Sequence, residues 1–116
     1  MTAITVERFF AHPPARIWRC LTEPELHARW WAPGDVRPVV GHVFELDMGK
    51  FGKQRCEVVV ADAPAMLRYR FATASLDTLI TWRLVPEDGG TLLRLTHDGF
   101  DDSPLARAAR SMKHLR

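Results

Sequence analysis

The chain has 116 residues, of which 47% are hydrophobic and 26% charged, and this length and composition fit one globular domain with a single core. Its formal net charge of +2 is too small to indicate a nucleic-acid-binding protein, which concentrates Lys and Arg on one face. No apolar stretch approaches the roughly 20 residues of a membrane-spanning helix and no signal-peptide-like segment opens the chain, so we expect a cytoplasmic protein that neither binds nucleic acid nor spans a membrane.

The first predicted element is a strand at residues 3–11, in which apolar and polar residues alternate. Because successive side chains point to opposite faces of a strand, Arg8 is expected on the same face as three apolar residues: Ile4, Val6 and Phe10. Pro13 and Pro14 end this strand, and Pro14 suits the first turn of a helix. An apolar stripe at helical spacing marks that helix: Ile17, Trp18 and Leu21.

A second helix is expected immediately after the first. Thr22 and Glu25 have the spacing of a capping box, in which the threonine caps the start of the helix. This helix carries Trp30, which we expect in the core, and it ends near Pro33-Gly34. Trp31 lies about 100° around the helix from its neighbour, so it is interpreted as a further packed residue, the rim of a cavity or part of an interaction patch.

Five apolar runs after the second helix predict the remaining strands of an antiparallel sheet, at roughly residues 43–48, 54–61, 67–71, 80–84 and 91–98. The side chains expected to face inward alternate with polar ones along these runs. They are Phe44, Leu46, Met48, Cys56, Val58, Val60, Leu67, Tyr69, Phe71, Ile80, Trp82, Leu84, Leu93, Leu95 and His97. The sequence Glu87-Asp88-Gly89-Gly90 is a strong hairpin signal between the last two strands.

A third helix is expected at the end of the chain. Ser103 can cap it, with Pro104 at its first position, and its thin apolar stripe includes Met112. At 1.5 Å per residue, this helix would span only about 21 Å before the chain ends at Arg116. Because the stripe is thin, formation of a homodimer remains open.

Several motifs carry a resemblance that covers almost the whole chain. They are Val6-x-Arg8-x-Phe10-x-x-x-Pro14, Ile17-Trp18-x-x-Leu21-Thr22, Pro24-x-Leu26, Arg29-Trp30-Trp31-x-Pro33, Asp62-x-Pro64-x-x-Leu67-x-Tyr69, Gly90-Thr91-x-Leu93-x-Leu95-Thr96-His97 and Gly99-Phe100. With these motifs the chain resembles the START-like, helix-grip superfamily often called SRPBCC, and within it the branch related to the C-terminal domain of the heat-shock-protein ATPase activator. Gly41-His42 departs from the two glycines that the family often has there. Whether the backbone bends here as in the family is therefore left open.

The resemblance implies an α+β helix-grip fold, also called birch-pollen-allergen-like, with residues 1–116 as one domain. In this fold a curved antiparallel sheet of about six strands surrounds a C-terminal helix, and two short helices follow the first strand. The final helix is about two turns shorter than usual, so either the cavity is open at one end, or a partner subunit covers it, or the chain is incomplete. Members of the superfamily bind apolar or amphipathic small molecules between sheet and helix or act as protein-interaction modules, and a minority are cyclases.

The expected cavity would be lined by inward-facing strand residues and by two residues of the helices. They are Arg8, Trp31, Phe44, Leu46, Met48, Val58, Tyr69, Phe71, Trp82, Leu95, His97 and Met112. A charge on the inward face needs a partner or a wet cavity. Arg8 is therefore interpreted either as a structural ion pair or snorkelling side chain, or as an anchor for the anionic head of a ligand. His97 is either a structural histidine whose hydrogen bonds are satisfied within the protein or a ligand contact. Tyr69 and Trp82 can both pack in the core and line the cavity, because these two roles overlap in a small domain.

No catalytic residue, metal site or cofactor is predicted. The histidines are dispersed without the close spacing of metal ligands. No glycine-rich loop opens a helix, and no serine has the context of a nucleophile. Cys20 and Cys56 lie far apart and are interpreted as small buried hydrophobic residues.

Three functions therefore remain open, and an enzyme is the least favoured. The favoured function is non-enzymatic binding of a small apolar or amphipathic ligand in a cavity between the sheet and the C-terminal helix. The first alternative, which the resemblance implies, is a protein-interaction or co-chaperone module with a chaperone as its partner. The second is a cyclase or aromatase-type enzyme, in which His97 and Tyr69 would be the acid–base candidates and Arg8 the oxyanion partner.

Overall fold

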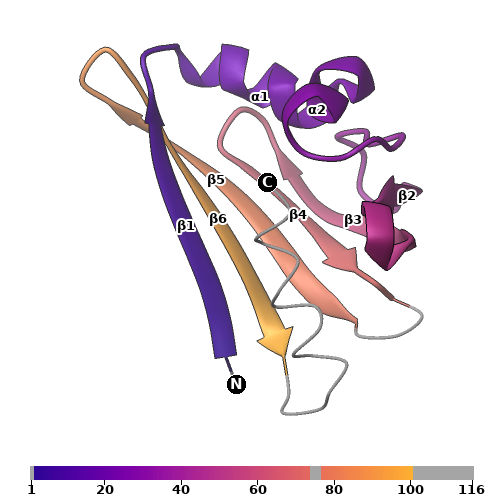
Figure 1. Ribbon diagram of the computed structural model, residues 1–116. Helices are drawn as coiled ribbons and strands as arrows, with labels where there is room; N and C mark the ends of the chain where they lie inside the picture. Colours follow the sequence, from indigo (N-terminus) through magenta and orange to yellow (C-terminus); the bar gives the residue numbers. More distant parts are fainter. Residues whose placement is uncertain (1, 74–76, 101–116) are drawn as a thin grey trace.

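Six antiparallel strands form one curved sheet in the order β1-β6-β5-β4-β3-β2 (Figure 1). The computed structural model describes residues 2–73 and 77–100. The strands are β1 (Thr2–Phe10), β2 (Val43–Asp47), β3 (Lys53–Asp62), β4 (Met66–Phe71), β5 (Thr78–Glu87) and β6 (Gly90–Phe100). The α+β architecture expected from the sequence is confirmed, whereas the final helix predicted from Ser103 onward lies outside the described residues.

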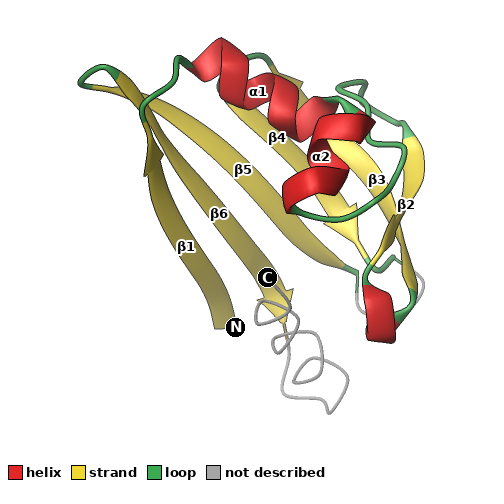
Figure 2. Ribbon diagram, turned by 45° about the horizontal axis from the view of Figure 1, so that its top comes forward, coloured by secondary structure: helices red, strands yellow, loops and turns green. Residues whose placement is uncertain are grey.

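Two short helices lie over the same face of the sheet, across one of its ends (Figure 2). They are α1 (Pro14–Thr22) and α2 (Pro24–Trp30), and a single 3-10 turn, η1 (Gly49–Phe51), follows β2. The stripe predicted for α1 is confirmed, because Ile17, Trp18 and Leu21 are all buried. Pro14 opens α1 as expected, so the chain turns from β1 into the helix within the short corner at residues 11–13.

The predicted capping box between α1 and α2 is wrong. Helix α1 continues through Thr22, whose hydroxyl donates to the carbonyl oxygen of Trp18 at 2.9 Å. Glu23 occupies the N-cap of α2 and makes no side-chain capping hydrogen bond. A threonine that bonds to the carbonyl four residues earlier is satisfied inside its own helix, so it does not cap the next one. Helix α2 ends at Trp30, three residues before Pro33.

The segment that follows α2 is held against β2. The buried side chain of His27 anchors its beginning, because His27 Nδ1 lies 2.9 Å from the carbonyl oxygen of Ala32. The amide of Asp47 then donates to the carbonyl oxygen of Pro33 at 2.8 Å. Gly34 passes so close to β2 that an added Cβ would collide with backbone there. A glycine is therefore required at this crossing.

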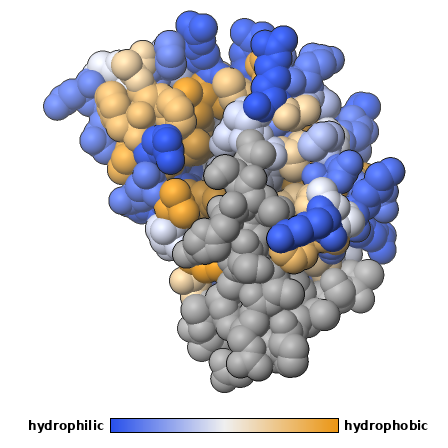
Figure 3. All heavy atoms as spheres, viewed as in Figure 1, coloured by the Kyte–Doolittle hydropathy of each residue, from blue (hydrophilic) through white to orange (hydrophobic). Residues whose placement is uncertain are grey.

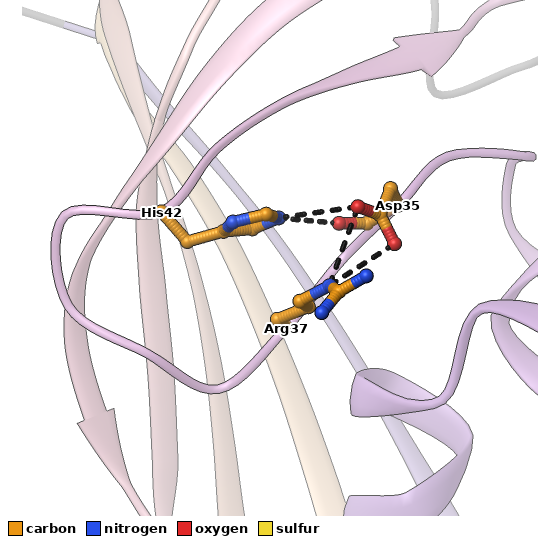
Figure 4. Close-up of polar contacts among 3 residues, drawn as sticks. All are labelled: Asp35, Arg37 and His42. Atoms are coloured by element: carbon orange, nitrogen blue, oxygen red, sulfur yellow. Dashed lines mark hydrogen bonds and ion pairs between the residues drawn. The ribbon is translucent and has the colours of Figure 1, made fainter.

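Three polar side chains close the loop that leads into β2 (Figure 4). Arg37 Nε donates to the two carboxylate oxygens of Asp35 at 3.2 and 3.3 Å. His42 Nε2 lies 2.6 Å from the backbone oxygen of Asp35, and its ring stacks on Phe44 with centroids 5.8 Å apart. Gly41 has a φ of +90°, which favours glycine. The departure from the family's two glycines thus keeps a glycine at the bend and uses a histidine to fix the loop.

The core lies between the inward face of the sheet and the two helices. The alternation predicted for the strands is confirmed in β2 and β4, where every second residue is buried. The largest fully buried side chains come from several elements: Trp82, Tyr69, Phe71, Leu21, Leu46, Leu67 and Ile80. The Asp88-Gly89 turn joins β5 to β6 as the hairpin signal predicts, because Glu87 pairs with Gly90 across it.

Candidate functional site

A hollow of about 770 Å³ lies on the inward face of the sheet, on the side where β1 and β6 pair. Its walls come from β1, the β1–α1 corner, α1, the end of α2 and facing positions of β5 and β6. The described residues that line it are Val6, Arg8, Phe10, His12, Arg16, Ile17, Cys20, Trp30, Trp31, Trp82, Leu93 and Leu95. Figure 3 shows hydrophobic residues gathered between β1 and α1, with hydrophilic residues around them.

Three tryptophans form one wall of the hollow. Trp82 makes edge contacts with Trp30 and Trp31, with ring centroids 5.3 and 5.2 Å apart. Trp30 Nε1 donates to the carbonyl oxygen of Cys20 at 2.9 Å, and Trp82 Nε1 donates to the hydroxyl of Tyr69 at 3.0 Å. Because these two N–H groups are bonded within the protein, their indoles can offer only ring carbon to a guest.

The polar groups of the hollow are basic. Arg8, His12 and Arg16 line it, and no Asp or Glu is among the described lining residues. Both arginine side chains are exposed, and neither makes a hydrogen bond or ion pair within residues 2–73 and 77–100. The backbone oxygen of His12 accepts a hydrogen bond from Thr91 Oγ1 at 2.8 Å. This bond fixes the β1–α1 corner, which carries His12 and joins the strand of Arg8 to the helix of Arg16.

The structure places the residues expected to line a cavity in three kinds of position. Those that line the hollow are Arg8, Trp31, Trp82 and Leu95. Those packed in the core, away from the hollow, are Phe44, Leu46, Met48, Val58, Tyr69 and Phe71. His97 is half-buried beside the hollow's β6 wall without lining it, and Met112 lies outside the described residues.

Tyr69 supports the tryptophan wall from behind. Its side chain is fully buried, and its hydroxyl accepts the hydrogen bond of Trp82. Burial raises the pKa of Tyr69, because the phenolate would lose its hydration in this environment. The residue is therefore neutral over the whole physiological range and has no access to a guest in the hollow.

His97 belongs to a polar contact between β5 and β6. Its Nε2 lies 2.7 Å from Thr78 Oγ1, and its ring meets that of Phe71 edge-on at 5.2 Å. Burial lowers the pKa of His97 to about 4, because it disfavours the charged imidazolium. This histidine is therefore neutral at pH 7. Both acid–base candidates of the enzyme hypothesis thus lie outside the lining.

The hollow has further lining residues that are not among the expected ones: Val6, Phe10, His12, Arg16, Ile17, Cys20, Trp30 and Leu93. Strand alternation does place Val6 and Phe10 on the inward face with Arg8, and positions 16, 17 and 20 share one side of a helix. The sequence pattern does not show that α1 folds back over β5 and β6. That arrangement puts the hollow beside β1 and leaves β2–β4 to form packed core.

The two cysteines have different surroundings. Cys56 is buried in β3, and burial raises the pKa of its thiol to about 12, so the reactive thiolate does not form at neutral pH. Cys20 is only partly buried and lines the hollow.

Within the described part of the chain, no three His, Cys, Asp or Glu side chains are grouped so that they could hold a metal ion. None of the described helices is long and apolar enough to cross a membrane.

Known proteins share this architecture. The model of the family described as Activator of Hsp90 ATPase homolog 1-like protein matches residues 11–114. Protein MLL2253 from Mesorhizobium loti is 33% identical with a TM-score of 0.81, covering 93% of this chain and 82% of that chain. Protein BH1534 from Bacillus halodurans is 25% identical with a TM-score of 0.81, covering 99% and 86%. The Aha1 dimer from Colwellia psychrerythraea is 18% identical with a TM-score of 0.78, covering 99% and 90%, a likeness of fold alone. No curated protein matches the chain.

Proposed function

The chain belongs to the family described as Activator of Hsp90 ATPase homolog 1-like protein, and from this membership we propose that it binds a small apolar or amphipathic molecule in the hollow beside β1 and β6. The observation that carries the proposal is the hollow itself, about 770 Å³ in volume and walled by tryptophan and leucine side chains. Small-molecule pockets have volumes of roughly 300–1,000 Å³ and mostly apolar walls with a few polar groups.

Burial of the guest's apolar surface would drive binding. Each methylene group that leaves water contributes about 0.8 kcal/mol, so a tail of about ten carbons gains about 8 kcal/mol before the costs of immobilisation. The tryptophan wall lowers those costs, because Trp82 is already held by Trp30, Trp31 and the hydroxyl of Tyr69. A wall that is ordered before the guest arrives loses little conformational entropy on binding.

The positions of the acid–base candidates support binding without chemistry. General acid–base catalysis needs a titratable group within hydrogen-bonding reach of the reacting atoms. Tyr69 is sealed behind the tryptophan wall and His97 is engaged between β5 and β6. A guest in the hollow would meet neither of them.

An uncharged apolar dye, Nile red, tests the proposal directly. We expect its fluorescence to rise on titration with the purified protein, and native mass spectrometry to show any molecule that co-purifies. Leu95→Trp fills the hollow and should weaken dye uptake at least tenfold, because about one aromatic ring of volume is lost to the guest. Leu92→Trp is the matched control, since Leu92 lies three positions earlier on β6 and does not line the hollow. A folded protein that takes up no dye would contradict the proposal.

A co-chaperone role is the second candidate, and an apolar surface patch favours it beside the family membership. The patch lies at the entrance to β2, where Val39, Val40 and Val43 are 58%, 63% and 43% exposed. If this patch docks onto a chaperone, the protein will stimulate the ATPase of Hsp90. Val40→Asp should then abolish the stimulation, while Leu95→Trp leaves it unchanged. An Hsp90 ATPase rate that does not respond to tens of micromolar wild-type protein would exclude this candidate.

A further inference from the structure

We propose that the guest is a monocarboxylate with an apolar tail, whose carboxylate pairs with Arg8 and Arg16 at the β1–α1 corner. This inference rests on the proposed binding function and adds the chemical class of the ligand. It follows from three features of the hollow: the sign of its charges, the lack of partners for its arginines among the described residues, and the separation of its basic rim from its tryptophan wall.

The acidic residues nearest in sequence are turned away from the hollow. Glu7 lies on the opposite face of β1 from Arg8 and pairs with Arg94, whose Nε is 2.6 Å from the carboxylate. The first turn of α1 contains no acidic residue. The rim formed by Arg8, His12 and Arg16 therefore carries the positive charges of the two arginines, and no carboxylate of the described lining offsets them.

The two arginines differ from the others around them. On α1, Arg19 is paired with Glu23 at 2.7 Å, and on β6, Arg94 is paired with Glu7 at 2.6 Å. Within the described ranges, Arg8 and Arg16 make no such bond, although both line the same hollow. Guanidinium groups match carboxylates in shape and bind them through two parallel N–H···O bonds. An incoming carboxylate would supply the partner that the described chain does not.

Two contacts hold the corner between these arginines against β6. Thr91, which is fully buried, donates to the backbone oxygen of His12 at 2.8 Å. Beside it, Gly90 packs so closely on the corner that a Cβ would collide with the backbone oxygen of Phe10. The backbones that carry Arg8 and Arg16 are thus fixed relative to β6, so their guanidinium groups can converge on one anion at little entropic cost.

The arrangement separates a head site from a tail site. The rim is open to water, because Val6 on the same strand is 42% exposed and Arg8 itself is exposed. A carboxylate there keeps part of its hydration and avoids the cost of burying a charge. The tail can then extend over Leu93 and Leu95 to the tryptophan wall, where the half-buried Trp30 presents ring carbon and the buried Trp82 packs behind it.

Three probes with the same ten-carbon tail test the head-group preference. Decanoate, 1-decanol and decylamine are titrated as competitors of Nile red, below their aggregation concentrations. We expect decanoate to compete about 5- to 30-fold more strongly than decanol, the range given by two solvent-exposed charge-assisted contacts. Decylamine should compete more weakly than decanol, because the rim repels a cation.

Variants identify the residues responsible. Arg8→Gln together with Arg16→Gln should abolish the preference, so that decanoate competes no more strongly than decanol does with the same variant. Arg19→Gln together with Arg94→Gln is the matched control, because it removes the same net charge from residues that do not line the hollow; it should keep the preference. In the wild type the preference should shrink between 0.05 and 0.5 M salt, since screening weakens exposed charge pairs.

The outcomes separate the two proposals. If the dye binds but decanoate and decanol displace it equally, or if the control pair loses the preference as fully as the rim pair, the carboxylate inference is overturned and the binding function stands. If the folded protein takes up neither dye nor any of the three probes, both proposals fail together.

Discussion

The hydrogen bond between the Trp82 indole and the Tyr69 hydroxyl is one of the polar contacts that support the wall of the hollow. Donor and acceptor are both buried and lie 3.0 Å apart. Tyr69→Phe would keep the ring and its packing but leave the indole N–H without this acceptor. A buried donor that loses its partner costs about 1–3 kcal/mol, so we expect a loss of unfolding free energy in this range, measured by urea denaturation.

A double-mutant cycle isolates this contact. Tyr69→Phe and Trp82→Phe each disturb packing in their own way, so the coupling energy of the pair is the informative quantity. We expect a coupling of about 1 kcal/mol. Additive effects of the two substitutions would show that the bond does not contribute to stability.

Acid sensitivity is a second prediction for a single residue. Burial lowers the pKa of His97 to about 4 from the 6.5 of an unperturbed histidine. Between these values the unfolded chain binds more protons than the folded chain, so this contribution to stability is complete above pH 6.5 and is lost as the pH falls towards 4. The loss is at most about 3 kcal/mol. It should be seen in urea midpoints between pH 4 and 7 and be absent in His97→Gln; parallel acid profiles of the two proteins would refute this assignment.

The sequence predicts which way a residue points more reliably than what it touches. Strand parity correctly places Arg8 inward and Tyr69 in the interior. Parity holds because the alternation of side chains is a local property of the backbone. The partner of each polar tip is a non-local property: Tyr69 meets Trp82 on the next strand, and His97 meets Thr78 nineteen positions earlier in the sequence. No local pattern encodes those pairs.

The β1–α1 corner packs closely against the start of β6, and Gly90 permits this close approach because it has no side chain. An added Cβ would collide with the backbone oxygen of Phe10 and come within 2.7 Å of the ring of Phe9. Because the first of these obstacles is backbone, the strain cannot be relieved by a rotamer change. We expect Gly90→Ala to lower the unfolding free energy by about 1–3 kcal/mol.

Thermal and urea denaturation measure this effect. Glu87→Ala, at the exposed position that pairs with Gly90 across the turn, is the control. A Gly90→Ala protein as stable as the control would mean that the corner can shift away from β6. The same variant should also weaken binding in the hollow, since it displaces the rim formed by Arg8, His12 and Arg16.

At the level of elements, the strands and the first helix follow from the sequence, and the capping between helices does not. Alternation over several residues identifies β2 and β4, because burial of one face repeats the same signal at every second position. The capping-box pattern at Thr22 rests on two residues, and the threonine bonds within α1 instead. A single side chain that has two possible hydrogen-bond partners cannot be assigned from spacing alone.

At the scale of the whole molecule, ligand binding and stability must be coupled. A ligand that binds only the folded state stabilises it by about 2.7 kcal/mol at one hundred times its dissociation constant. For a domain of this size, that corresponds to a rise of roughly 10 °C in the thermal midpoint. We expect decanoate to produce such a rise in the wild type and a much smaller one in Leu95→Trp. Equal rises in both proteins would place the ligand outside the hollow.

The position of the hollow depends on the arrangement of the whole chain. The fold class can be predicted from the sequence, because the order of strands and helices and the motifs that resemble the helix-grip superfamily together specify it. The hollow depends on β1 lying beside β6 with Val6 opposite Leu95 and Arg8 opposite Leu93. Those pairs join the two ends of the described chain, so the alternation within each strand does not reveal them. For this reason the sequence predicts lining residues on β2, β3 and β4, whereas the hollow lies beside β1 and β6.

The pairing of β1 with β6 also has a consequence for synthesis. Glu7 and Arg94, which bridge the two strands, are 87 positions apart. On a ribosome that adds about 5–20 residues per second, β1 waits on the order of ten seconds for its neighbour. During that interval Val6, Phe9 and Phe10 are exposed on an unpaired edge, so the nascent chain is most vulnerable to association with other chains before its last strand emerges.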